Sequence, residues 1–409
     1  MRQRSQWPLS PIGLAVILLL AGCANLSGDA GGVLETAQYS SEHYLVRLVG
    51  PSLGAGGDEL ARRAAILMER MFNVYAGLDE LPLPPGDPMP FWLHLDRRDY
   101  DRQAALYEFP AMATNGFCTT SGEVHVYYRT LDGHPPEATA MHEGFHQYCH
   151  RGLHYPAPPE VFQRVSGYRL AKIPTVPLWL AEGMAMNVES GRIERDHNGL
   201  IIGIDDVGSI NRERLDHLAK LINGGNCPSV RHTLNLIMGD QINSDYYSVM
   251  WGVVFDLRMA SGEAIFRREQ RELERAGPEA VRAAIDAAID PLRPYPYLRW
   301  PVPVAGRLLR ACRAVWGLDV PSLVDICAAG AREPRDFDRQ WNRRLTQAAL
   351  SEVEKLLQDN GETLEQWEVG WKKRMLTLYA EVRGGGYRYI EPPGIRKAAS
   401  ASGRKPGAW

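Results

Sequence analysis

The sequence of 409 residues predicts an α+β protein, in which a region with several strands precedes a mainly helical remainder. Three runs rich in β-branched and aromatic residues have the length and alternation of strands: Tyr44–Val49, Phe91–Leu95 and Glu123–Tyr128. After residue 135 apolar residues recur every three or four positions, which is the spacing of amphipathic helices. The change from the first pattern to the second is the basis of the predicted fold class.

Residues 41–134 are predicted to form an N-terminal α/β subdomain. Apolar residues from Leu60 to Leu78 repeat at helical spacing, so Asp58–Gly77 is predicted as an amphipathic helix with Asp58 as its N-cap. The segment Leu81–Pro90 is rich in proline and is predicted as a loop.

The pattern H-E-x-x-H occurs at His142-Glu143-Gly144-Phe145-His146. On a helix its two imidazoles lie one turn apart on the same face, so they can bind one metal ion together. Pro135 and Pro136 favour a helix start before the motif, and Gly152 favours its end. The glutamate Glu143 then lies beside the open coordination position of the metal, where a general base is needed.

A catalytic zinc ion usually has three protein ligands and one free position. Glu182, in the apolar segment Trp179-Leu180-Ala181-Glu182-Gly183-Met184-Ala185, is the candidate third ligand. His150 lies one turn beyond His146, but a fourth protein ligand would close the site, so His150 is predicted to lie outside the ligand set. Asn187 and Glu189 are two candidates for the outer partner that orients a ligand.

Together these two motifs resemble those of the gluzincin metallopeptidases, and in particular the aminopeptidase N branch, which carries H-E-x-x-H followed by W-L-N-E-G-F-A. The resemblance covers residues 135–266, about a third of the chain. It implies a thermolysin-like arrangement, with a small mixed β-sheet ahead of the zinc helix and one Zn²⁺ bound by His142, His146 and Glu182. Aminopeptidases of this type also have a tyrosine at the start of a later apolar helix, and Tyr247 matches it better than Tyr246.

Two features depart from the aminopeptidase pattern. The stretch between His146 and Glu182 is longer than in typical aminopeptidases, which requires an insertion there. The G-x-M-E-N motif, whose glutamate holds the amino terminus of a substrate, is absent, and Ala111–Asn115 is only a faint counterpart without the acid. Aminopeptidase specificity is therefore not implied.

Residues 135–275 are predicted to form the helical zinc-binding subdomain, 276–390 a C-terminal helical region, and 391–409 a disordered basic tail. The helical patterns are Leu215–Ile222, Val230–Met238, Ser248–Met259, Leu308–Val315, Phe337–Leu357 and Leu364–Val382.

The N-terminal residues 1–22 have the features of a lipoprotein signal peptide. Two arginines precede the apolar run Ile12–Leu20, which is too short to span a bilayer comfortably. The run leads into Leu-Ala-Gly-Cys, which resembles the lipobox of bacterial lipoproteins, with Cys23 as the lipidated residue. Residues 23–40 are predicted to be a flexible tether, and the protein is predicted to be anchored to the outer membrane and to face the periplasm.

The overall charge makes nucleic acid an unsuitable partner, since the formal net charge is −3 and the pI is about 6.4. Besides Cys23 the chain has five cysteines. The resemblance places a strand edge beside the zinc helix, so a disulfide between Cys118 and Cys149 is one alternative, and two buried thiols are the other.

The sequence thus predicts a zinc-dependent metallopeptidase that hydrolyses peptide or protein substrates. Glu143 is the predicted general base, and Tyr247 is predicted to stabilise the oxyanion. The alternative is a non-catalytic gluzincin-like lipoprotein that binds peptides or partners in the cell envelope.

Overall fold

The computed structural model describes residues 35–257, 327 and 334–385, with breaks at 52, 54–55, 77–85, 108–114, 120, 129–135, 153–154, 157–171, 174, 196–200, 206–209, 238–239 and 359–360. The predicted signal peptide, the lipidated Cys23, the helical pattern Leu308–Val315 and the tail 391–409 lie outside the described residues.

A five-stranded mixed sheet forms the N-terminal part of the fold, in the order β1-β2-β3-β5-β4. The two central pairings, β2 with β3 and β3 with β5, are parallel, and the outer pairings are antiparallel. The strands are β1 (Glu35–Ser40), β2 (Tyr44–Gly50), β3 (Met89–His94), β4 (Gly116–Cys118) and β5 (Val124–Tyr127).

The three predicted strands are confirmed within two residues at each end, as β2, β3 and β5. The predicted tether 23–40 is wrong for its last six residues, because Glu35–Ser40 is the edge strand β1. This strand looks like a linker because five of its side chains are exposed and only Ala37 is buried. Antiparallel pairing with β2 through the backbone, rather than apolar side chains, holds it in place.

Two helices cover one face of the sheet, α2 (Gly57–Ala76) and α4 (Pro136–Gly152). Alternate residues of β2, β3 and β5 point into the core that these helices share with the sheet. The helices approach closely at Gly144, where a Cβ would lie 2.6 Å from Met68 Cε and 2.9 Å from the Tyr75 hydroxyl. That hydroxyl donates a hydrogen bond to the Met141 carbonyl at 2.6 Å, which fixes α4 on α2.

Helix α3 (Arg97–Leu106) packs with β5 around a second, smaller cluster: Tyr100, Ala104, Phe117 and Tyr127. It begins at an N-cap, Asp96, whose side chain accepts a hydrogen bond from the Asp99 N–H at 3.0 Å. This helix follows β3 directly and was not predicted.

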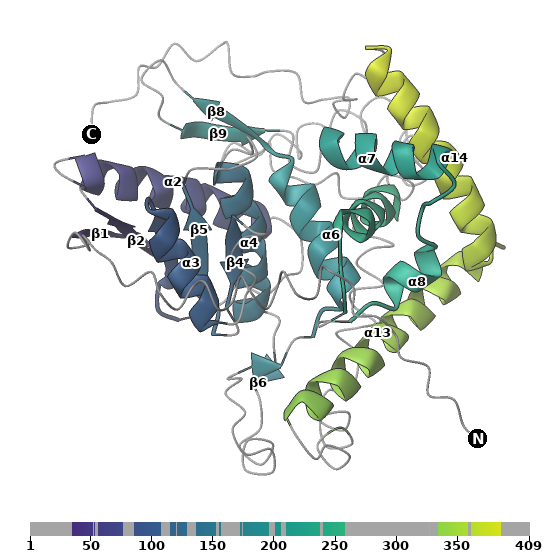
Figure 1. Ribbon diagram of the computed structural model, residues 1–409, viewed down its shortest axis with the longest axis horizontal. Helices are drawn as coiled ribbons and strands as arrows, with labels where there is room; N and C mark the ends of the chain where they lie inside the picture. The colour runs from purple at the N-terminus through teal and green to yellow at the C-terminus, as the bar shows by residue number, and fades with distance from the viewer. Residues whose placement is uncertain are drawn as a thin grey trace, which may run out of the picture.

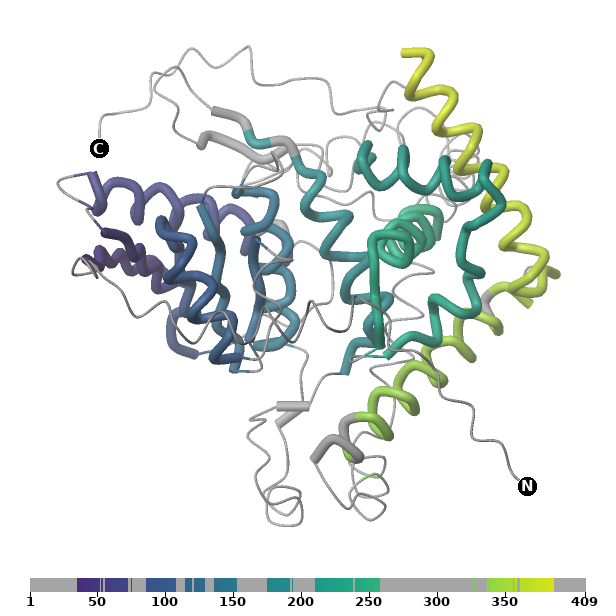
Figure 2. The backbone as a smooth tube through the Cα atoms, in the orientation of Figure 1, coloured from purple at the N-terminus to yellow at the C-terminus, as the bar shows by residue number. Residues whose placement is uncertain are grey.

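The rest of the described chain is mainly helical and lies beside the sheet, with α4 and α6 adjacent between the two parts (Figures 1 and 2). Its helices are α6 (Leu178–Glu189), α7 (Arg212–Asn223), α8 (Val230–Leu234), a helix over residues 244–257, α13 (Pro334–Gln358) and α14 (Leu364–Arg383). Each helical pattern predicted within the described residues thus contains a helix, although the predicted Val230–Met238 is helical only as far as Leu234. Two short antiparallel pairs add to them: β6 (Tyr155–Pro156) with β7 (Lys172–Ile173), and β8 (Arg192–Arg195) with β9 (Ile201–Asp205).

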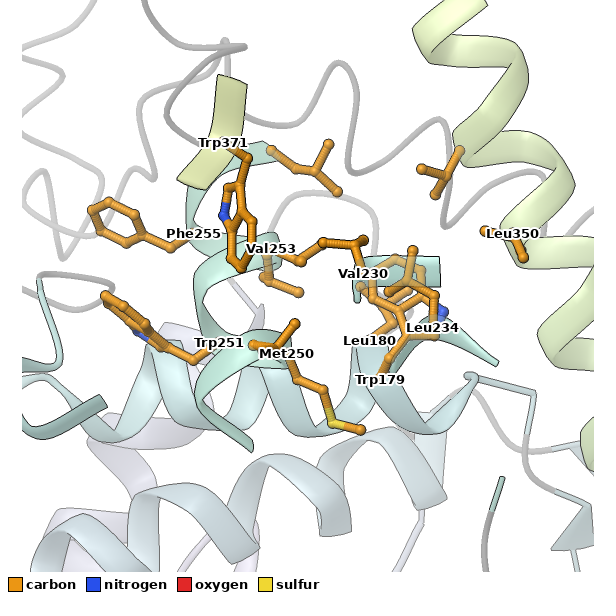
Figure 3. Close-up of a cluster of buried hydrophobic side chains, with 14 of the residues drawn as sticks. Trp179, Leu180, Val230, Leu234, Met250, Trp251, Val253, Phe255, Leu350 and Trp371 are labelled. Atoms are coloured by element: carbon orange, nitrogen blue, oxygen red, sulfur yellow. The ribbon is translucent and has the colours of Figure 1, made fainter. Parts of the chain in front are cut away.

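A tryptophan-rich core holds the helical part together, and Figure 3 shows Trp179 of α6, Trp251 of helix 244–257 and Trp371 of α14 within it. Gly252 lets α14 approach helix 244–257 closely, since a Cβ there would lie 3.0 Å from Trp371 Cζ2. The Trp371 indole N–H donates a hydrogen bond to the Gly252 carbonyl at 3.0 Å. Helix 244–257 is thus fixed between α6 and the C-terminal helices.

The four described cysteines are free, including Cys118 and Cys149. The alternative of unpaired thiols therefore holds for these two, and burial raises the pKa of the Cys118 thiol well above its ordinary value. Among the described helices, none combines the length and the apolar character needed to cross a bilayer.

Candidate metal centre

Helices α4 and α6 bring the three predicted metal ligands together. His142 and His146 lie one turn apart on α4, and their Nε2 atoms are 3.2 Å from each other. Glu182 on α6 faces them, with carboxylate oxygens 3.3 Å from the Nε2 of His142 and 3.6 Å from that of His146. In the described part of the chain these residues form the one group of ligand atoms, all within 4.8 Å of one another, that could hold a metal ion.

The spacing of these donor atoms fits a small divalent cation. Zinc lies about 2.0–2.2 Å from nitrogen and oxygen ligands, so tetrahedral geometry puts two donors about 3.3–3.6 Å apart. The observed separations of 3.2, 3.3 and 3.6 Å are close to that value. Two imidazoles and one carboxylate leave a fourth position open, which is the ligand arrangement of catalytic zinc sites.

The imidazole of His142 is oriented by a carboxylate behind it. Its Nδ1 lies 2.8 Å from Oε2 of Glu189, the last residue of α6, so the Nδ1–H donates to that carboxylate and Nε2 faces Glu182. Burial alone would lower the pKa of His142, but hydrogen bonds to Glu182 and Glu189 outweigh burial and raise it well above its ordinary value. A carboxylate behind the imidazole also makes the imidazole a more basic ligand.

Glu182 is held in its ionised form. Burial would raise its pKa, but the nearby charge of His146 and hydrogen bonds from both histidines lower it well below the ordinary value. An anionic carboxylate therefore faces the two imidazoles, which is a favourable environment for a cation.

Glu143 lies on α4 between the two histidines and faces the edge strand β4. A Cβ at Gly116 of that strand would lie 2.8 Å from Glu143 Cγ, so the carboxylate is packed directly against the sheet edge. Burial raises the pKa of Glu143, and the neighbouring carboxylates Glu182 and Glu189 raise it further, although the histidines oppose this. A carboxyl group with a raised pKa beside the ligands is suited to proton transfer near neutral pH.

The two adjacent tyrosines point in different directions. The Tyr246 hydroxyl lies 3.2 Å from Nε2 of His232 on α8. Tyr247 instead lies within electrostatic reach of Glu182 and Glu143, and the charge of Glu182, followed by burial, raises the pKa of its phenol well above the ordinary value. The sequence-based choice of Tyr247 thus selects the tyrosine that lies next to the clustered residues.

The remaining candidates fall into two groups. Glu189 is the outer partner of His142, whereas the Asn187 amide donates to the Gly183 carbonyl at 2.7 Å, so it orients no ligand. His150 is buried against Gly122 rather than exposed at the surface, and it is not part of the ligand cluster.

Three residues near the site were not predicted. Gly116 lies in a strand of only three residues, which is too short to detect by alternation. Asn211 and Arg214 belong to the first turn of α7 and approach the site only through the tertiary fold. Their sequence pattern, an N-cap asparagine before a helix, indicates a helix start but no role in a site.

A second polar cluster lies in the sheet, where the histidines have no informative spacing in the sequence. His94 contacts Asp99 Oδ2 through Nδ1 at 2.6 Å and His125 Nδ1 through Nε2 at 3.0 Å. All three side chains are buried, and the Nε2 of His125 has no hydrogen-bond partner in the part of the chain that the structure describes. Phe117 and Trp92 stack on the His125 ring, with interplanar angles of 11° and 0°.

The sequence matches no protein-family model and shows no significant similarity to any curated protein.

Proposed function

We propose that this protein is a zinc-dependent metallopeptidase of the gluzincin type, acting on peptide or protein substrates. The observation that carries the proposal is the convergence of His142, His146 and Glu182 at separations of 3.2 to 3.6 Å, with Glu143 on the same helix as the histidines. These are the residue types and the spacing that a hydrolytic zinc site requires.

A bound zinc ion supplies Lewis acidity, which lowers the pKa of a water molecule toward neutrality and polarises a carbonyl group. Glu143 accepts the proton of the attacking water as the water oxygen bonds to the carbonyl carbon. The same carboxyl group then delivers the proton to the amide nitrogen, and the C–N bond breaks. Its raised pKa makes the carboxylate a stronger base than an ordinary glutamate, which favours acceptance of the proton.

Tyr247 supplies a hydroxyl donor for the oxyanion that develops on the carbonyl oxygen. The charge of Glu182 and burial raise the pKa of its phenol above an ordinary value that already keeps the hydroxyl protonated at physiological pH. Glu189 holds His142 in the tautomer whose Nε2 binds the metal.

The second candidate is a non-catalytic lipoprotein that retains this site to bind peptides or envelope partners. A binding protein has no need of a general base, so the position and raised pKa of Glu143 favour the enzyme. A structural zinc site is also disfavoured, because such sites fill all four positions with protein ligands.

The decisive experiment measures zinc content and hydrolysis of a generic protein substrate, with and without a chelator, for the wild type and for Glu143→Gln. We expect wild-type protein to contain zinc and to cleave, and Glu143→Gln to keep the metal and lose turnover. Glu137→Gln, the same substitution in the first turn of α4, is the control and should remain active. Zinc without cleavage of any peptide library would favour the binding protein.

The proposal includes attachment to the membrane through Cys23, on the strength of the lipobox-like sequence alone. Two or more acyl chains would hold the protein stably at a membrane. Fractionation tests this directly, since Cys23→Ser should move the protein from the membrane fraction to the soluble periplasmic fraction.

A further inference from the structure

Glu189 lies at a position where an ionised carboxylate is stable only with hydrogen-bond donors from other elements. It is the last residue of α6, and the C-terminal end of a helix carries a partial negative charge that repels an anion. The structure gives this carboxylate a partner on each oxygen. Oε2 accepts from His142 Nδ1 at 2.8 Å, and Oε1 accepts from the Asn211 side-chain amide at 2.8 Å.

Asn211 makes two hydrogen bonds in opposite directions. Its Oδ1 accepts from the Arg214 N–H at 3.2 Å and so caps the N-terminus of α7, while its Nδ2 donates to Glu189. An amide has both an acceptor and a donor group, which these two bonds need together. Aspartate could form the cap but would place a second carboxylate against Glu189.

Helix α7 itself is fixed to the helical part of the protein. Leu215, Leu218 and Ala219 are buried, and Leu218 packs so closely on helix 244–257 that a Cβ at Gly252 would lie 2.8 Å from its Cδ2. The position of Asn211 is therefore set by the tryptophan-rich core rather than by a free loop.

The same turn of α7 also reaches the other side of the site. The Arg214 guanidinium carbon lies 5.7 Å from the centre of the Tyr247 ring. One helical turn thus contacts both the residue behind a metal ligand and the residue that is proposed to stabilise the oxyanion.

We propose that Asn211 is a positioning residue of the metal centre: by holding Glu189 it fixes the ring of His142 and increases the affinity of the site for zinc. This inference rests on the proposed metal site. Outer partners of this kind typically contribute about 10- to 100-fold to metal affinity, and we place Asn211 near the lower limit because it acts through one intermediate residue.

The test measures the zinc dissociation constant by competition with a chromogenic chelator for the wild type, Asn211→Ser and Asn211→Asp. Serine and aspartate both form good N-caps, so α7 and the thermal midpoint of the metal-free protein should be preserved. We expect about tenfold weaker binding for Asn211→Ser, which loses the amide donor, and a larger loss for Asn211→Asp. Asp96→Ala removes the cap of α3 on the sheet and should leave zinc affinity unchanged.

A double-mutant comparison separates positioning from a general structural effect. If Asn211 acts through Glu189, then Asn211→Ser should have no further effect on zinc affinity once Glu189→Gln is present. The absorption spectrum of the Co²⁺-substituted protein gives a readout independent of activity, and Asn211→Ser should change it.

The outcomes are distinguishable. Wild-type affinity in Asn211→Ser, or additive losses in the double mutant, would overturn the role of Asn211 and leave the proposed function intact. A wild-type protein that binds no zinc would overturn both.

Discussion

Gly116 of β4 and Glu143 of α4 are in such close contact that a Cβ on residue 116 would lie 2.8 Å from Glu143 Cγ and 2.5 Å from Thr139 Cγ2. The edge of the sheet therefore limits where the proposed base can lie. Glycine at this position lets α4 pack against β4 without displacing the Glu143 carboxylate.

Replacing Gly116 by alanine should therefore reduce turnover more than metal binding. We expect kcat to fall by about 10- to 100-fold because a displaced catalytic group of this kind loses much of its contribution, while zinc affinity stays near wild type. Steady-state kinetics and chelator competition measure the two quantities. Gly56→Ala is the control, since among the described residues a Cβ there has no neighbour within 4 Å. Equal effects of the two substitutions would contradict the prediction.

Tyr247→Phe removes the proposed oxyanion donor and keeps the ring. We expect kcat to fall about a hundredfold or more with little change in zinc content, as for the loss of one oxyanion donor elsewhere. The neighbouring Tyr246→Phe removes a hydroxyl that contacts His232 instead, and its kcat should stay close to wild type. If the two variants lose activity equally, Tyr247 has no special place in catalysis.

Gly183→Ala should destabilise the crossing of α6 with helix 244–257. The added methyl group would meet Val254 Cγ2 and lie 2.8 Å from the Met250 carbonyl oxygen, which belongs to the backbone and cannot rotate away. Overpacking of this kind costs about 1–3 kcal/mol in unfolding free energy, measurable by chemical denaturation. Gly370→Ala in α14 should cost less, because the gain in helix propensity offsets a 3.0 Å contact with Arg374 Nη1, whose guanidinium is held by the Asp256 carboxylate.

The histidine pair in the sheet should make folding sensitive to acid. Burial, with a contribution from His94, lowers the pKa of His125 to about 3 from the ordinary value of 6.5. Above pH 6.5 the group is neutral in both folded and unfolded states and costs nothing. Between pH 6.5 and about 3 only the unfolded state binds the proton. This residue therefore lowers the free energy of unfolding by about 1.4 kcal/mol for each unit by which the pH decreases.

Asparagine at position 125 can donate to His94 but does not titrate, so His125→Asn should flatten the dependence of unfolding free energy on pH in that window. The exposed His232→Asn is the control and should keep the wild-type slope. An unchanged slope in His125→Asn would mean that His125 binds its proton equally well in the folded and unfolded states, which would contradict the prediction.

The sequence predicts those parts of the fold that depend on local spacing. The one-turn separation of His142 and His146 follows from helix geometry alone, and α4 begins and ends where its proline and glycine residues indicate. The place of Glu182 required the resemblance to known metallopeptidases, since its approach to α4 is a contact between two helices.

Other features depend on pairings that the sequence does not encode locally. The contact of His94 with His125 arises because β3 and β5 are parallel neighbours. Trp92 lies opposite His125, and His94, two residues further along β3, points to the same face of the sheet. Strand β1 is held by backbone hydrogen bonds, so its polar side chains give no strand pattern. The link from Glu189 to Asn211 joins the end of one helix to the start of another, across a stretch of chain whose course the spacing does not predict.

The two helices that carry the proposed ligands pack differently: α4 packs on the sheet, whereas α6 contributes Trp179 and Leu180 to the tryptophan-rich core and Ala185 and Val188 to the sheet core. A cation coordinated by both helices would act as a crosslink between the halves of the molecule. Removing the cation should weaken the contact between α4 and α6, so the melting temperature should drop on addition of chelator. At a free zinc concentration a hundred times the dissociation constant, the bound ion would contribute about 2.7 kcal/mol to the free energy of unfolding.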